Sequence, residues 1–361
     1  MLTSLSSPAE PEAELEAFLT RLRARVMEYL GPRQDSPEQL DHLRHVANRA
    51  RWLYFVEIQR QNPGSPPAIS LHDDRLIEAC ALGHDIGKWV PREVLRALLP
   101  ADRAGLLPIV RELRLLPNQI DLLQLGVRRR LALPQDGYSP EYDAAHHLVS
   151  ALILTADAGL GFHHLSLGDQ EHLIDAIIGH QFGSYFKERL FQISLHDRAV
   201  TTGMLVDVSR PELLAGDWLA CAFHDADIAD LLYVGSLEHR PGREDYLHAG
   251  GLVKILLINF MTTVHHVPDA PNTYEDCLRS CQLTVTSVGR EFLTATAIEH
   301  GRKWRHQANR FLDTLREPET AERFKSVLYD QAQPPAERLA ALRLLTHHHA
   351  RRFVDALRQE A

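Results

Sequence analysis

The sequence has few cysteines, no long hydrophobic run and no recognisable leader. Its four cysteines lack the CxxC spacing of zinc motifs, and Cys277 and Cys281 are spaced as neighbours on one helix face. No window approaches about 18 consecutive apolar residues, and residues 1–11 lack the charged and apolar segments of a signal peptide. We therefore expect a cytoplasmic protein in a reducing compartment, with no membrane contact.

Positive charge is also in short supply. Lysine and arginine number 39 against 48 aspartates and glutamates, and the formal net charge is −9. Duplex nucleic acid is bound through basic surfaces, so the composition argues against duplex nucleic acid as a partner. A small anionic substrate remains compatible with it, because a bound metal ion would supply local positive charge. Nothing in the composition indicates an oligomeric state.

Helical patterns cover most of the 361 residues, of which 45% are hydrophobic. We find no internal repeat and no convincing set of alternating strands, so the predicted fold class is all-α. The expected organisation is an N-terminal tail and helix (1–35), a main domain (36–240) with an insertion at about 91–140, and a helical C-terminal region (241–361). The boundary near residue 240 rests on the break at residues 240–243.

The segment of residues 82–88, Leu-Gly-His-Asp-Ile-Gly-Lys, is the most informative stretch. An apolar helical pattern precedes it, so His84 and Asp85 leave the C-terminal end of a buried helix and Gly87 interrupts that helix. Adjacent imidazole and carboxylate groups are costly to bury unless something binds them, and a divalent metal would bind both. Lys88 lies one turn beyond His84, where its ammonium could meet a phosphate.

Two histidines follow the capping-box sequence at residues 36–39, which opens a helix. The residues that follow His42 on the same helix face, one turn apart, are apolar. The residues that follow His45 on its face include Arg49 and Trp52. His42 is therefore the better candidate for pointing inward at a metal.

A later helix carries His146 and His147, and periodicity does not choose between them. Ser150 and Ala151, one turn on, leave room for a neighbouring helix or for a substrate. A further predicted helix ends at His180.

Three carboxylates lie in an apolar helical pattern at Asp225, Asp227 and Asp230. Periodicity leaves both Asp225 and Asp227 as candidates for the buried face.

Taken together, these contexts resemble the HD-domain metal-dependent phosphohydrolases. The resemblance rests on His42 with Val46-Ala47, on the 84–88 segment, on His146, on His180 and on Asp227, in that order along the chain. The run of contexts is most similar to that of the small bacterial HD hydrolases that split diadenosine tetraphosphate symmetrically. The resemblance implies an HD-domain helical bundle with additional helices.

The resemblance also implies a site with one or two divalent ions (Fe, Mn, Zn, Ni, Co or Mg). It implies metal ligation by His42, His84, Asp85, His146, His180 and Asp227, and catalytic roles for Asp85, Lys88, His146 and His180. If only one ion binds, His146 and His180 become phosphate contacts or proton donors. The expected substrate is a small nucleotide or phosphoester, cleaved by metal-activated water. The alternative is a non-catalytic helical regulatory or ligand-binding protein that keeps a structural or sensing metal.

Further histidine runs at 163–164, 265–266 and 347–349 lack these ordered contexts. We interpret them as surface or packing histidines.

Overall fold

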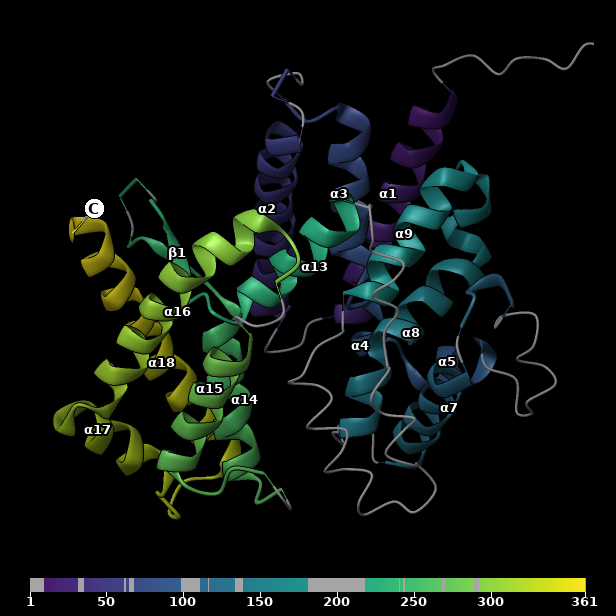
Figure 1. The fold of residues 1–361 in the computed structure, drawn as a ribbon. Coiled ribbons are helices and arrows are strands. Elements are labelled where there is room, and N and C mark those ends of the chain that lie inside the picture. The colour runs from purple at the N-terminus through teal and green to yellow at the C-terminus, as the bar shows by residue number, and fades with distance from the viewer. Residues whose placement is uncertain are drawn as a thin grey trace, which may run out of the picture. The chain divides into compact units, whose positions relative to one another are not determined.

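The computed structural model describes most of the chain, and its described part is almost entirely helical (Figure 1). This confirms the predicted all-α class. None of the described helices is long and apolar enough to cross a membrane. The described residues are 10–31, 36–61, 63–64, 68–98, 111–115, 117–133, 139–180, 218–239, 241–242, 244–267, 270–288 and 292–360. Most of the predicted tail and part of the 91–140 insertion therefore lie outside them.

Contacts among the elements divide the chain into two compact units. The first comprises Met1–Ser36 and Ala47–Asp225, and the second comprises Pro37–Val46 and Ala226–Ala361. The division falls inside two helices, α2 (Ser36–Gln61) and α13 (Trp218–Asp230). Each of these helices therefore contributes one part to each unit.

The first unit is built around the helix α8. Every residue from Ala144 to Thr155 is buried, as expected for a helix that is apolar on all sides. Helices α3, α4, α5, α7 and α9 pack against it, and α1 packs against α3. The helices of this unit besides α2 and α13 are α1 (Glu10–Leu30), α3 (Leu71–Gly83), α4 (Ile86–Trp89), α5 (Arg92–Leu98), α7 (Pro117–Ala132), α8 (Pro140–Ala156), η1 (Ala158–Leu160), η2 (Phe162–His164) and α9 (Leu167–Gly179).

The backbone of α4 approaches α8 very closely at Gly87. A Cβ atom at this position would lie 2.5 Å from the carbonyl oxygen of His146 and 2.9 Å from the backbone nitrogen of Ser150. The Ser150 hydroxyl donates to the carbonyl of His84 at 2.6 Å and accepts from the backbone N–H of Gly87 at 2.9 Å. The room left by Ser150 is thus filled by the turn that follows α3.

The second unit contains five helices within its described residues and one hairpin. The helices are α14 (Gly251–Val264), α15 (Tyr274–Val288), α16 (Ala295–Arg316), α17 (Pro318–Leu328) and α18 (Pro335–Glu360). In sequence order each packs on the next, and α18 returns to pack on α14 (Figure 1, green to yellow).

The hairpin pairs β1 (Gly235–Glu238) antiparallel with β2 (Tyr246–Ala249), with Gly235 opposite Ala249, and α18 packs against both strands. The sequence did not predict these strands, because four residues are too few for a convincing alternation. The break at residues 240–243 lies between them, and the predicted domain boundary near residue 240 stays a prediction.

Candidate metal centre

The turn after α3 places His84 and Asp85 side by side in the interior of the first unit. α3 ends at Gly83, His84 is its C-cap with its N–H bonded to the carbonyl of Cys80, and Asp85 precedes α4. Both side chains are completely buried. The predicted position of this pair at a buried helix end is therefore confirmed.

Asp85 is surrounded by cationic and imidazole groups. Its Oδ1 lies 2.7 Å from Nζ of Lys88, 3.1 Å from Nε2 of His146 and 3.6 Å from Nε2 of His84. Burial raises the pKa of Asp85, but Lys88, His84 and His146 outweigh burial and hold that pKa well below its usual range. Asp85 is therefore an ionised carboxylate in the interior.

The imidazole of His180 joins this group, which we call the Asp85 group: His84, Asp85, His146 and His180. Nε2 of His180 lies 3.2 Å from Nε2 of His146, and its ring meets the ring of His84 edge-on with centroids 5.0 Å apart. The carbonyl of His180 accepts a hydrogen bond from Nδ1 of His224 at 2.9 Å. The group thus draws on the C-terminal ends of α3 and α9 and on α8, and the part of α13 in the first unit supports it through His224.

The hydrogen bonds on the far side of each ring determine which nitrogen is available. Nδ1 of His84 donates to the carbonyl of Ala81 at 2.9 Å, and Nδ1 of His180 donates to the carbonyl of Ile177 at 2.6 Å. Nδ1 of His146 donates in the same way to the carbonyl of Asp143. The Nε2 atoms of the three rings are therefore the ones left to face the Asp85 carboxylate, one another or a bound ion.

These atoms fit the requirements of a metal ion. Ligands bound to one ion at about 2.0–2.2 Å are separated from one another by roughly 3.0–3.5 Å. The separations at His146 are 3.1 Å to Asp85 and 3.2 Å to His180, and ligand atoms of all three residues lie within 4.8 Å of one another. The Lys88 ammonium, 2.7 Å from Oδ1, balances the charge of the Asp85 carboxylate here, and a metal ion bound among the three ligand atoms would share that role. This group could therefore hold a metal ion.

A second group of potential ligands lies in the second unit, where α2 meets the end of α13. Nε2 of His42 lies 3.3 Å from Oδ1 of Asp227, and Nδ1 of His42 donates to Oδ2 of Asp230 at 2.8 Å. Burial and Lys254 lower the pKa of His42, but the hydrogen bonds with Asp227 and Asp230 outweigh them and raise it. A carboxylate that holds the far nitrogen of a histidine is the usual support of a metal-ligating imidazole.

Asp230 is the residue of this group that the sequence analysis left without a role. It is fully buried, and its three-residue spacing from Asp227 places both carboxylates on one face of α13. The three-residue spacing of the two aspartates could have indicated from the sequence that Asp230 joins Asp227 in this group.

His147, His45 and Asp225 are the alternatives to His146, His42 and Asp227. They are also buried, but they have different neighbours. The ring of His147 lies 6.1 Å from that of His180, whereas His146 contacts Asp85 directly. Nδ1 of His45 is 3.8 Å from Asp230, and its ring packs edge-on against Tyr233. Asp225 is completely buried at the end of the first unit. Which member of each pair binds a metal stays a prediction.

Comparison of the chain with protein-family models, with curated proteins and with solved structures finds no match. The residues themselves therefore carry the functional argument.

Proposed function

We propose that this chain is a metal-dependent phosphohydrolase of the HD type that cleaves a phosphoester or phosphoanhydride of a nucleotide-like substrate. The observation that carries the proposal is the convergence of three imidazole Nε2 atoms on one buried, ionised carboxylate at Asp85. Imidazole nitrogens and a carboxylate at ligand spacing in the interior form a donor set that suits a divalent ion, so a function that uses such an ion is the simplest explanation.

In this proposal the Asp85 group, together with His42 and Asp227, supplies the ligands for one or two ions, as the resemblance to the HD family implies. The bound ion would supply an activated water and polarise a phosphoryl oxygen. The backbone carbonyls of Ala81, Asp143 and Ile177 keep the imidazoles oriented. Lys88, which is partly exposed, would neutralise charge on the phosphoryl oxygens of the substrate.

The test combines metal analysis with a screen for phosphate release. Protein purified without a histidine tag is analysed for Fe, Mn, Zn, Ni and Co, and then assayed with nucleoside mono-, di- and triphosphates and with diadenosine tetraphosphate. We expect bound metal and hydrolysis of at least one substrate, with both lost in His146→Ala. His164→Ala, which removes an exposed histidine of the same unit, should change neither.

Absence of metal under all loading conditions would overturn the proposal. Bound metal without hydrolysis of any of these substrates would instead favour a helical regulatory protein.

A further inference from the structure

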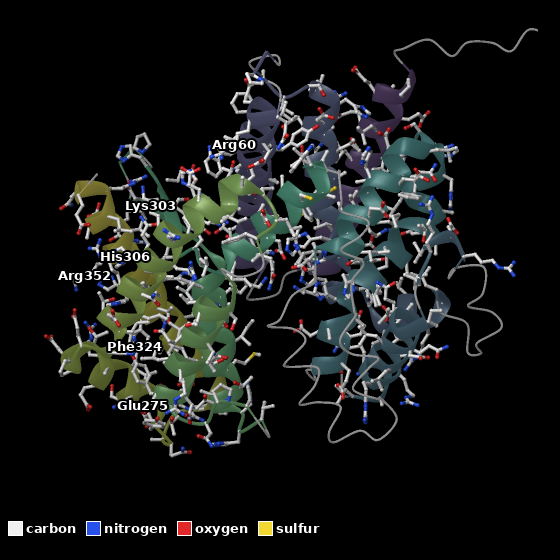
Figure 2. All side chains as sticks on the ribbon, in the orientation of Figure 1. Arg60, Glu275, Lys303, His306, Phe324 and Arg352 are labelled. Atoms are coloured by element: carbon white, nitrogen blue, oxygen red, sulfur yellow. The ribbon has the colours of Figure 1, made fainter. Side chains whose placement is uncertain are left out.

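A second candidate site lies far along the chain, among the last helices of the second unit. A cavity of about 300 Å³ opens between α16, α17 and α18. Phe324 and Phe353 are among its lining residues, and we call this almost completely buried pair its apolar floor. Figure 2 labels Phe324 and Arg352, which lie on α17 and α18. The volume is at the lower end of the range for small-molecule sites.

Positive charge is concentrated around this cavity, although the chain as a whole is acidic. Arg310, Arg323 and Arg352 line it, against the single acidic residue Glu317. Arg310 is held by Glu360 through two hydrogen bonds of 2.8 Å. Arg323 and Arg352 form no ion pair with any carboxylate in the described part of the chain. Two guanidinium groups are thus available to an anion.

A neighbouring cavity of about 360 Å³ provides a contrast. It is also lined by cations, but each of these is neutralised within the unit. Arg279 pairs with Asp276, Arg316 with Asp313 and Lys325 with Glu275, at 2.7–3.0 Å. Available positive charge therefore distinguishes the first cavity from the second.

The effect of this charge is visible on a histidine in the same cavity. Burial, followed by Arg352, His348 and Arg323, lowers the pKa of His349 to about 4. Nε2 of His349 donates to the Thr314 hydroxyl at 2.8 Å, and that hydroxyl donates to the carbonyl of Phe311 at 2.7 Å. His349 is therefore neutral near pH 7 and held in a fixed orientation. The positive charge of the cavity comes from its arginines.

We propose that this cavity binds a small phosphorylated ligand of about mononucleotide size, with the phosphate on Arg323 and Arg352 and the apolar part over Phe324 and Phe353. Guanidinium groups match the geometry of phosphate oxygens and bind them in a bidentate manner. The apolar floor favours an organic phosphate over the free ion. This inference is independent of the proposed hydrolase function.

The test is isothermal titration calorimetry of the full chain with three probes: AMP, inorganic phosphate and adenosine. We expect AMP to bind, phosphate to bind more weakly, and adenosine to give no measurable binding. The double variant Arg323→Ala with Arg352→Ala should weaken AMP binding by about 10- to 100-fold, because charged hydrogen bonds are lost. Arg279→Ala, which removes an exposed arginine of the neighbouring cavity, should leave AMP binding unchanged.

Circular dichroism and thermal unfolding test whether the double variant is folded. If it is not, the single variant Arg352→Gln, whose side chain is exposed on α18, replaces it with an expected loss of about 10-fold or less. Absence of AMP and phosphate binding would overturn the proposal. AMP binding that survives the arginine variants but is lost in Lys88→Ala would also overturn it, because the ligand would then lie at the Asp85 group.

Discussion

Each histidine of the Asp85 group donates its Nδ1 hydrogen to the carbonyl three residues earlier in its own helix or turn. The local backbone, and not a distant partner, therefore decides that Nε2 faces the carboxylate. The orientation of each imidazole therefore depends only on its own helix. Once that helix has formed, Nδ1 is held by the backbone and Nε2 faces the group.

Lys88 is predicted to act on the substrate and not on the metal. Its ammonium lies 2.7 Å from Asp85 and competes there with any bound cation. Lys88→Ala should therefore keep or slightly increase the metal content measured by elemental analysis. Turnover should fall by a factor equivalent to about 2–4 kcal/mol, because charge developing on the phosphoryl oxygens loses its partner.

The matched control is Lys303→Ala, which removes an exposed lysine of α16 (Figure 2) and should leave turnover unchanged. Normal turnover in Lys88→Ala would show that Lys88 only supports the Asp85 carboxylate.

His42 and His45 are predicted to differ in their effect on metal content. His42 directs Nε2 at Asp227 and is held by Asp230, whereas His45 packs against Tyr233. His42→Ala should therefore lose most of the bound metal after dialysis, while His45→Ala keeps most of it. Equal loss in the two variants, measured by elemental analysis on folded protein, would contradict the choice of His42.

At the scale of elements, the contact between α4 and α8 depends on the missing side chain of Gly87. Gly87→Ala would place a Cβ 2.5 Å from the His146 carbonyl, so the backbone of one element must shift. We expect the free energy of unfolding, measured by urea denaturation, to fall by about 1–3 kcal/mol. Gly64→Ala is the control, because nothing lies within 4 Å of its added Cβ, and it should change stability little.

The helices were largely predictable from the sequence, and their partners were not. The N-terminal helix expected within residues 1–35 and the helix end before His84 were predicted from local sequence, and the structure has both as α1 and α3. Periodicity did not separate His146 from His147, because α8 is buried on every side and has no polar face to compare. The bond between His42 and Asp230 joins residues 188 positions apart, which no local pattern encodes.

At the scale of the whole molecule, stability is predicted to fall in mild acid partly through His349. Burial and Arg352 lower its pKa to about 4 in the folded state, whereas the unfolded chain has an ordinary histidine pKa of 6.5. Between these values the unfolded state binds more protons, so stability decreases as the pH falls from about 6.5 towards 4. The contribution should be about 1 kcal/mol, because partial exposure screens the charges.

Chemical denaturation at pH 7.5 and pH 4.5 measures this loss. His349→Gln keeps a donor for Thr314 without a titrating group, so it should lose less stability than the wild type over that interval. An equal loss in both proteins would assign the acid sensitivity to other groups.

The second unit combines two segments that are far apart in the sequence, and this separates them in time during synthesis. Residues 37–46 belong to this unit, yet their partners, such as Asp230 and His248, are synthesised far later. At a translation rate of about 5–20 residues per second, the 188 residues between His42 and Asp230 require roughly 10–40 s. Throughout that time His42 and Asp41 lack their native partners, so the hydrogen bonds that join the start of α2 to the rest of the second unit can form only late in synthesis.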